Sequence, residues 1–309
     1  MTNLDIEFKQ FNDTIKLTEA RKEKILNSRN AIREKIRTYM KNKLKLEQPK
    51  FMWQGSFAIN TALNPINGNE VDIDDGMYLN HLSKIKERLW PSPKEVHNMI
   101  LAALEGHTQN GCEDKTSCVR VIYSGSYHVD IPVYIIREGH AKLANIKTNK
   151  WEISDSKDFR DWFYKYRKDE QANRIVRYLK AWRDFNVYDF SSIELTILVV
   201  NNYVQDADDG QSLSATVEKI YSDICMNRKV VKPVAPRENL WREKTNKIDT
   251  LIFNFEQLKK DLKSACTNKS KNRATLILQE QFGDRFPVIT DKCQEDTLEY
   301  SQSVKPWRM

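Results

Sequence analysis

Hydrophobic and polar residues follow two different patterns along the chain, and the change falls near its middle. Over residues 5–46, apolar residues recur every three or four positions between lysines and arginines, which predicts one or two long helices that end at Pro49. Residues 51–56 are expected to form a turn, and the stretch 64–70, with its Pro, Asn and Gly residues, is expected to be a loop. The first strand should therefore follow this loop.

Runs rich in Val, Ile and Tyr predict three strands in the first half. They are "EVDIDDGMYL" at 70–79, "SCVRVIYS" at 117–124 and "YHVDIPVYII" at 127–136, with "SGS" at 124–126 as a hairpin turn. Before the second run, Pro91 and Pro93 open a helix for which Ser92 or Ser83 is the expected cap.

From about residue 158 the strand pattern disappears and helical patterns follow one another. The residues after Phe286 are expected to form a loosely tethered tail. A first half of mixed elements followed by a helical second half predicts an α+β protein with two lobes.

Composition narrows the class of protein. The net charge is +7, but 43 Asp and Glu nearly match 50 Lys and Arg, which excludes a histone-like tail. Residues 226–275 carry 13 Lys or Arg against 5 Asp or Glu, so this region either flanks a phosphate site or forms solvated helix faces. The five cysteines, without a CxxC pair, indicate free thiols in a reducing cytosol, and no apolar run approaches the roughly 20 residues that span a bilayer. We expect a cytoplasmic protein outside the membrane.

Carboxylates are crowded onto two of the predicted strands. Side chains alternate along a strand, so Asp72 and Asp74 share a face, and Asp130 shares a face with His128 and Pro132 on the other strand. Such close like charges are unfavourable unless one is protonated or a cation lies between them, and carboxylate oxygens suit Mg²⁺. Three strand carboxylates can hold two metal ions about 3.5 to 4 Å apart, which indicates phosphoryl or nucleotidyl transfer.

A Gly-Ser pair ahead of these strands fits the same chemistry. Gly55 lets backbone N–H groups approach a polyphosphate, and the Ser56 hydroxyl can donate to a phosphate oxygen. The chain contains neither GxxxxGK[ST] nor GxGxxG, so a P-loop and a dinucleotide-binding fold are not expected.

The order Gly-Ser, spacer, Asp-x-Asp and a distant third Asp resembles the polymerase-beta-like nucleotidyltransferases. Further motifs narrow the resemblance to the bacterial cGAS/DncV-like nucleotidyltransferases, or CD-NTases, and cover residues 54–287. These motifs are "QGSFAINTALNP", "VDIDDGMYL", "HVDIPVY", "RYLKAWRD", "SSIELTILV" and "FGDRFP". The resemblance implies a two-lobed cage: a catalytic lobe at 1–160, with a mixed sheet and a long N-terminal spine helix, and a helical lobe at 161–309 that closes over the nucleotides.

The resemblance also implies roles for individual residues. Asp72 and Asp74 would ligate two Mg²⁺ ions, with Mn²⁺ as an alternative, and Asp130 would help to bind the ion that activates the acceptor hydroxyl. The donor triphosphate would be contacted by Gln54, Gly55, Ser56, Lys180 and Ser192. From the residues alone, Lys180 could equally be an exposed lysine beside the core of its helix.

The implied function is synthesis of a cyclic oligonucleotide second messenger, in particular a cyclic dinucleotide made from ATP and GTP, in antiphage (CBASS) signalling. The product would act through a downstream effector, and the enzyme would be a monomer open to activation by a regulatory protein or a nucleic acid. Two alternatives stay open: a linear, template-independent nucleotidyltransferase of the same fold, and a nucleic-acid binding module whose basic regions contact a phosphate backbone.

Other features point less directly to function. His107, Cys112 and Cys118 suggest a zinc cluster, but their spacing fits no standard pattern, so free thiols and an ordinary histidine are expected. The acidic loop 205–210 is interpreted as a solvated turn rather than a metal site. Aromatic residues at helical spacing in the second half are expected in the core rather than on a base: Tyr178, Trp182, Tyr188 and Tyr203.

Overall fold

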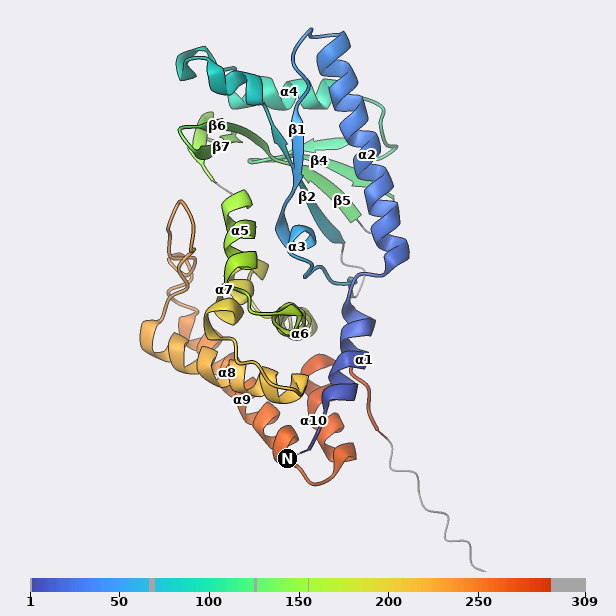
Figure 1. The fold of residues 1–309 in the computed structure, drawn as a ribbon, viewed down its shortest axis with the longest axis vertical. Coiled ribbons are helices and arrows are strands. Elements are labelled where there is room, and N and C mark those ends of the chain that lie inside the picture. Colours follow the sequence, from blue (N-terminus) through green and yellow to red (C-terminus); the bar gives the residue numbers. More distant parts are fainter. Residues whose placement is uncertain (1, 67–69, 125–126, 155, 290–309) are drawn as a thin grey trace, which may run out of the picture.

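In the computed structural model, a lobe built on a β-sheet stands above a lobe of packed helices (Figure 1). The structure describes residues 2–66, 70–124, 127–154 and 156–289. The α+β class and the two lobes predicted from the sequence are confirmed. The expected tail beyond residue 289, the centre of the loop at 64–70 and part of the turn at 124–126 lie outside the described residues.

Two helices open the chain, as predicted. α1 (Asp5–Ile15) lies in the helical lobe, and α2 (Glu19–Asn42) runs along the sheet as its spine (Figure 1). Between them, the Thr18 side chain accepts the backbone N–H of Arg21 and caps α2. One stripe of α2 is buried and consists of Ile25, Ile32, Ile36 and Met40.

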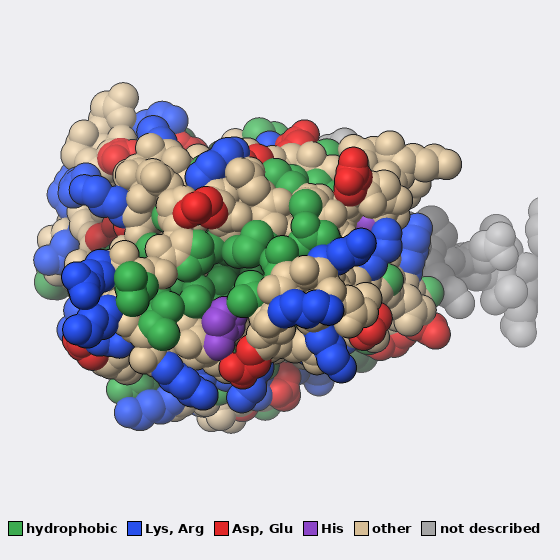
Figure 2. Space-filling view, turned by 90° about the horizontal axis from the view of Figure 1, so that it is seen from above, with side chains coloured by type: hydrophobic (Ala, Val, Ile, Leu, Met, Phe, Trp, Pro, Cys, Tyr) green, Lys and Arg blue, Asp and Glu red, His purple; other side chains and the backbone are tan. Residues whose placement is uncertain are grey.

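The upper lobe contains one mixed sheet, with the strand order β3-β4-β5-β2-β6-β7-β8 and β1 paired to the second half of β2. β2 is parallel to β5 and β6, and the other pairs are antiparallel. The strands are β1 (Lys50–Trp53), β2 (Val71–Tyr78), β3 (Cys112–Asp114), β4 (Val119–Tyr123), β5 (Tyr127–Ile131), β6 (Val133–Arg137), β7 (His140–Asn145) and β8 (Lys150–Ile153). Seen from above, this lobe shows hydrophobic side chains in the middle of its face and Lys and Arg around them (Figure 2).

Two local predictions are wrong. Residues 51–56 are not a turn: β1 extends to Trp53, opposite Asp75 of β2, and a short helix α3 (Gly55–Ala58) follows. The run 127–136 is not one strand, because Pro132 has no N–H and separates β5 from β6. Three short, polar strands carried too weak a hydrophobic pattern to be predicted: β3 and β8 at the two edges of the sheet, and β7 beside β8.

Most of the remaining residues form helices, which are joined by loops. After the 3₁₀ turns at Asn80–Lys84 and Glu87–Leu89, α4 (Pro93–Ala103) begins at Ser92, one of the two predicted caps, which forms a reciprocal capping box with Glu95. Ser83 lies in the first of these turns and does not cap the helix. The lower lobe consists of α5 (Ser156–Tyr166), α6 (Glu170–Asn186), α7 (Ser192–Asn202), α8 (Asp209–Asn227), α9 (Ile248–Thr267) and α10 (Lys271–Phe282). Among the described helices, none combines the length and apolar character that crossing a membrane requires.

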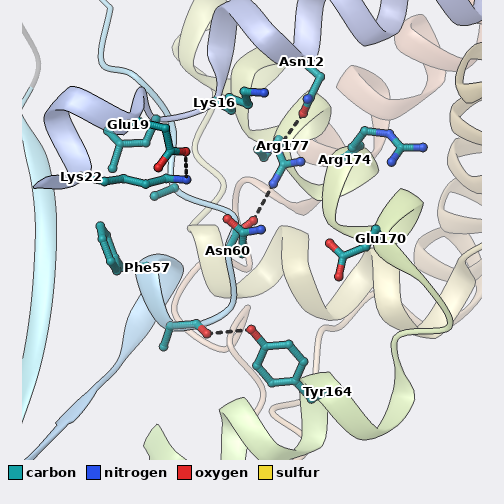
Figure 3. Close-up of a pocket in the computed structure, with 13 residues that line it drawn as sticks. Asn12, Lys16, Glu19, Lys22, Phe57, Asn60, Tyr164, Glu170, Arg174 and Arg177 are labelled. Carbon is teal, nitrogen blue, oxygen red and sulfur yellow. Dashed lines mark hydrogen bonds and ion pairs between the residues drawn. The ribbon is translucent and has the colours of Figure 1, made fainter.

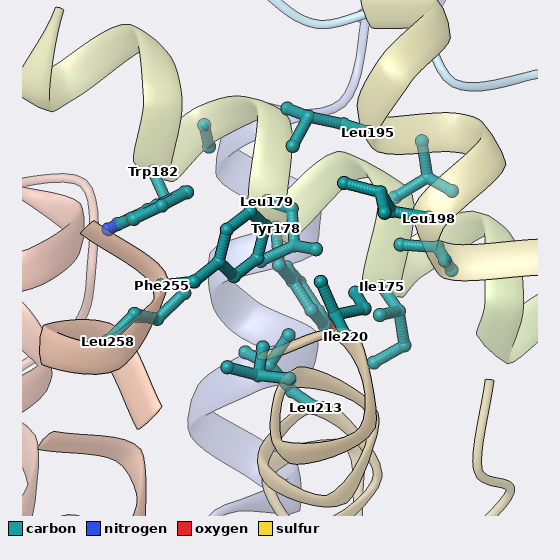
Figure 4. Close-up of a cluster of buried hydrophobic side chains, with 14 of the residues drawn as sticks. Ile175, Tyr178, Leu179, Trp182, Leu195, Leu198, Leu213, Ile220, Phe255 and Leu258 are labelled. Atoms are coloured by element: carbon teal, nitrogen blue, oxygen red, sulfur yellow. The ribbon is translucent and has the colours of Figure 1, made fainter. Parts of the chain in front are cut away.

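The helical lobe has its own core, centred on α6. Side chains of α6, α7, α8 and α9 meet there, including Tyr178, Leu179 and Trp182 (Figure 4). The side chains of α1 complete this core, because Phe8 and Phe11 pack against Tyr178, Phe282 and Phe286. A second core lies between the sheet, α2 and α4. The boundary at residue 160 stays a prediction, while the packing assigns the side chains of α1 to the helical core.

Candidate active site

The three aspartates singled out in the sequence lie together on the central strands. In the parallel pairing of β2 with β5, Asp72 is opposite His128 and Asp74 is opposite Asp130. Neighbours in a parallel ladder point to the same face of a sheet, so all three carboxylates share one face. The structure thus brings together the residues that the alternation pattern predicted to meet.

Two of these carboxylates are held by basic side chains. Asp130 accepts two hydrogen bonds from Arg120 of β4, both 2.8 Å long, and these raise the pKa of the arginine. Asp72 contacts Nε2 of His128, and Nδ1 of the same ring lies 2.9 Å from a Glu70 carboxylate oxygen. Burial alone would lower the pKa of His128, but the contacts with Asp72 and Glu70 raise it. The chain itself therefore supplies positive charge at this site.

Asp74 differs from its neighbours. Its side chain makes no hydrogen bond or ion pair with any described residue. Burial, together with the charges of Asp130 and Asp72, raises the pKa of Asp74 to about 6. A raised carboxylate pKa means that the site disfavours its own negative charge, which a bound cation would relieve.

The donor set fits a hard metal ion, although the side chains are not gathered around one point. Within the described ranges, no three His, Cys, Asp or Glu side chains form a group that could hold a metal ion. The cause is local, since Asp130 is directed at Arg120 and Asp72 at His128. A cation would have to replace these partners. Three carboxylates on adjacent strands, one of them without a partner among the described residues, are the kind of oxygen ligands that Mg²⁺ prefers.

The Gly-Ser pair lies against these aspartates. Gly55 has a φ of +59°, and a Cβ at this position would lie 2.1 Å from Oδ2 of Asp74, so only glycine fits. Gln54 is buried, and its amide is bonded to the hydroxyls of Tyr78 and Tyr134 at 3.1 Å each. We therefore expect the Gln54 side chain to support the Gly55–Ser56 turn from its buried side.

A cavity of about 440 Å³ separates the two lobes at this point. The sheet lobe contributes the three aspartates and the Gly55–Ser56 pair, α7 contributes Ser192 and Thr196, and the loop between α8 and α9 contributes Lys232. A neighbouring cavity of about 390 Å³ is lined by residues including Ser56, Asp72, His128, Lys180, Arg183 and Ser192.

Lys180 and Ser192 reach these cavities from the helical lobe. Lys180 is almost fully buried, and its Nζ donates to the carbonyl of Thr61 at 2.8 Å. Burial, reinforced by the charge of Arg183, lowers the pKa of Lys180 to about 7. Ser192 accepts a hydrogen bond from Arg183 at 3.2 Å. The sequence-predicted nucleotide contacts therefore face the aspartates from across the gap.

The prediction of a solvated turn at 205–210 is right for residues 205–207, which are exposed, and wrong for residues 208–210, which are buried. Asp208 and Asp209 are buried, because Asp208 caps α8 and Asp209 accepts hydrogen bonds from Arg174, Tyr178 and Gln171. No local pattern indicated these partners, which come from elsewhere in the chain.

The histidine, the cysteine and the aromatic residues named in the sequence analysis have the following surroundings. His107 pairs with the hydroxyl of Tyr123 at 2.9 Å, and Cys118 is a buried free thiol whose pKa is raised by burial and by Asp130. Tyr178 and Trp182 are fully buried, Tyr203 nearly so, and Tyr188 packs against the same core.

Sequence reasoning missed Arg120 and Glu70 as parts of the site. A signal for Arg120 was present, because antiparallel pairing of two strands joined by a short turn places it opposite Asp130. Glu70 lies just before β2, and nothing in the sequence indicated that its carboxylate meets His128.

Comparison with known proteins identifies the family. The model "Cyclic GMP-AMP synthase DncV-like, nucleotidyltransferase domain" matches residues 49–134, and "Cyclic GMP-AMP synthase, C-terminal domain" matches residues 170–292. A cyclic GMP-AMP synthase of Escherichia coli (strain TW11681) is 26% identical, over 84% of this chain and 73% of that protein. A c-di-GMP synthase of Roseivirga ehrenbergii is also 26% identical, over 79% of this chain and 75% of that protein.

Solved structures agree on the fold. The Vibrio cholerae DncV cyclic AMP-GMP synthase in complex with the linear intermediate 5′ pppA(3′,5′)pG matches with a TM-score of 0.76 at 23% identity, covering 92% of this chain and 97% of that one. The same enzyme with nonhydrolyzable GTP gives 0.76 at 24% identity, covering 94% and 99%. Because the two family models together match more than half of the residues, in both lobes, the chain belongs to the DncV-like nucleotidyltransferases.

Proposed function

We propose that this protein is an enzyme that joins two nucleoside triphosphates into a cyclic dinucleotide and releases pyrophosphate at each transfer. The observation that carries the proposal is the cavity between the lobes, where Asp72, Asp74 and Asp130 meet the Gly55–Ser56 turn. The names of the relatives, a cyclic GMP-AMP synthase and a c-di-GMP synthase, support a purine cyclic dinucleotide as the product.

In each transfer, a ribose hydroxyl oxygen forms a bond to the α-phosphorus of a triphosphate, the bond to pyrophosphate breaks and the hydroxyl proton leaves. Asp72 and Asp74 would hold two Mg²⁺ ions, with Asp130 sharing one of them. When bound, these ions activate the attacking hydroxyl and neutralise the departing pyrophosphate. No protein nucleophile is required, since positioning and charge stabilisation carry this chemistry.

The chain's own residues bind and orient the donor. Gly55 lets the turn lie directly against Asp74, and the Ser56 hydroxyl donates to a phosphate oxygen. Lys180 and Ser192 contact the same phosphates from the helical side. Contacts from both lobes fix the reacting groups relative to each other, which lowers the entropic part of the barrier.

Further parts of the proposal rest on the family resemblance. They are magnesium as the ion, ATP and GTP as substrates, a functional division into lobes at 1–160 and 161–309, antiphage (CBASS) signalling through an effector that binds the product, and a cytoplasmic monomer.

The test is to incubate the purified protein with Mg²⁺ and radiolabelled ATP, GTP, CTP and UTP, singly and mixed, then treat the products with phosphatase and identify them by mass spectrometry. A phosphatase-resistant product whose mass corresponds to a cyclic dinucleotide is expected. Only phosphatase-sensitive products would establish a linear nucleotidyltransferase instead. No product under any mixture, together with salt-dependent binding of nucleic acid, would favour the binding module.

A further inference from the structure

The segment that follows the Gly-Ser turn is held through its backbone by side chains of the helical lobe. Asn173 Nδ2 donates to the carbonyl of Ile59 at 2.7 Å, Arg177 Nη1 to that of Asn60 at 2.5 Å, and Lys180 Nζ to that of Thr61 at 2.8 Å. The donors are four and three positions apart, so they form one row on one face of α6. Consecutive carbonyls are thus matched to consecutive turns of a helix.

Neighbouring contacts extend this row. The Tyr164 hydroxyl of α5 donates to the carbonyl of Ala58 at 2.9 Å, and Arg177 also donates to the side chain of Asn12 at 2.8 Å (Figure 3). The row is buried, with exposed fractions of 0% for Asn173, 7% for Arg177 and 4% for Lys180. Buried donors and carbonyls are costly to leave unpaired, which makes these contacts hard to break.

The row connects to the catalytic residues through short backbone links. The N–H of Thr61 donates to the carbonyl of Ser56 at 2.8 Å, and the N–H of Gln54 donates to the carbonyl of Asp74 at 3.0 Å. Ile59 lies in the core of the helical lobe, which fixes the same segment from its other side. The position of the Gly-Ser turn against Asp74 therefore depends on α6.

The members of the row differ in access to the nucleotide. Lys180 lines the cavity beside Asp72 and Ser56, whereas Arg177 lines a separate cavity of about 500 Å³ on the α1 side (Figure 3). The described residues that line the two cavities at the aspartates include neither Asn173 nor Arg177. Neither side chain lines the nucleotide cavities, so each acts on the reaction mainly through the backbone that it holds, and Arg177 adds the effect of its charge on Lys180.

We propose that Asn173 and Arg177 are positioning residues of the transfer reaction, which hold the 59–61 backbone so that Gly55 and Ser56 meet the donor triphosphate. This inference rests on the proposed function. It assigns the helical lobe a second task besides covering the cavity: α6 sets the geometry of the phosphate-binding turn on the opposite lobe.

The test compares two arginines on the same helix in the full-length protein with Mg²⁺. Arg177→Met removes the contact with Asn60. Arg174→Met is the matched control, because Arg174 lines the same cavity but binds Asp209 and not the 59–61 segment. Both variants should lower the melting temperature. Only Arg177→Met should weaken binding of a nonhydrolysable triphosphate and raise KM, by roughly 10- to 100-fold.

Two further measurements separate positioning from general stability. Hydrogen exchange at the Thr61 amide should accelerate in Arg177→Met and stay unchanged in Arg174→Met. Arg177→Lys keeps the positive charge, and its single ammonium group can reach either the Asn60 carbonyl or the Asn12 side chain. This variant should therefore recover part of the triphosphate affinity.

An unchanged KM and unchanged exchange in Arg177→Met would overturn the inference, as would an equal loss of affinity in Arg174→Met. If the wild-type protein makes no product, the proposed function fails, and the exchange and binding data alone decide the inference.

Discussion

The pattern Asp-x-Asp-Asp-Gly occurs twice in the chain, at residues 72–76 and 206–210, and the two copies serve different purposes. The first copy lies within β2 and faces the cavity between the lobes. The second begins before α8 and is mostly buried. Identical local sequence therefore does not determine whether a set of carboxylates becomes a reactive site.

The last aspartate behaves alike in both copies. Asp75 accepts two hydrogen bonds from Arg33 at 2.7 and 2.5 Å, and Asp209 accepts two from Arg174 at 2.6 and 2.8 Å. Both carboxylates are almost completely inaccessible to solvent. In each copy, this position connects a helix to the element that carries the pattern.

The first two aspartates account for the difference. In the second copy, Asp206 accepts the N–H of Asp208, and Asp208 accepts the N–H groups of Gly210 and Leu4, because a helix start offers free backbone donors. In a strand, those N–H groups are used by the ladder, so Asp72 and Asp74 must find partners elsewhere. A carboxylate without a backbone donor remains available to a cation.

The strongest test of this comparison is to remove Asp72 and Asp74, the two aspartates that remain available to a cation. Asp72→Ala combined with Asp74→Ala should abolish pyrophosphate release, because the remaining Asp130 cannot supply the ligands of two ions. The melting temperature should change little, since the lost contact between Asp72 and His128 is offset by the relief of repulsion at Asp74. Steady-state pyrophosphate assays and thermal melts check both; a variant that still turns over triphosphates would refute the site.

Removing an aspartate that is paired with an arginine should lower stability and leave activity intact. Asp209→Asn should lower the free energy of unfolding by about 3 to 5 kcal/mol, because it leaves Arg174 without its buried partner. Urea denaturation measures this, and activity per folded molecule should be retained. Asp75→Asn should show a loss of similar size, and a much smaller one would break the parallel between the two copies.

A third test concerns the close approach of Gly55 to Asp74 of the first copy. Gly55→Ala should reduce kcat/KM about 100-fold, since the new methyl group would displace Asp74 and misplace the reacting groups. Gly111→Ala is the control, because it replaces another glycine with positive φ and open space around its Cβ position. Equal activities of the two variants would contradict the proposed role of the approach.

The smallest expected effect is a change in the number of protons that Lys180 takes up when a triphosphate binds. Because the pKa of Lys180 is lowered to about 7, the side chain is mostly neutral at pH 8, and a bound phosphate should raise that pKa again. Triphosphate binding at pH 8 should therefore take up close to one more proton in the wild type than in Lys180→Met. At pH 6 the difference should vanish; calorimetry in buffers of different ionisation enthalpy measures it.

The same lysine affects stability with a defined sign. Its pKa in the unfolded chain is higher than in the folded protein, so the unfolded state binds more protons between about pH 7 and the ordinary lysine pKa. The contribution of Lys180 to stability should therefore increase as the pH rises through this range.

The sequence predicts well those features that depend on periodicity. The long helices at the N-terminus, the strand 71–78, the cap at Ser92 and the common face of Asp72, Asp74 and Asp130 all follow from spacing. The family prediction, made from ordered motifs, is confirmed by the two matching models. The roles of the individual site residues stay predictions.

The missed features depend on contacts between distant segments. Asp209 is buried because Arg174 and Tyr178 lie on another helix, and Arg177 meets Asn60 across 117 positions of sequence. Local hydrophobicity has no information about such partners. The short β1 was missed for a related reason, since its pairing with β2 determines its conformation.

The packing of α1 against Phe282 and Phe286 joins two segments that lie about 270 positions apart in the chain. A ribosome makes Phe8 and Phe11 early, but their aromatic partners emerge only after some 270 further residues. Until then, the side chains of α1 lack the part of the helical core that Phe282 and Phe286 form. A growing chain that has not yet reached Phe286 would thus present these aromatic side chains to chaperones and proteases.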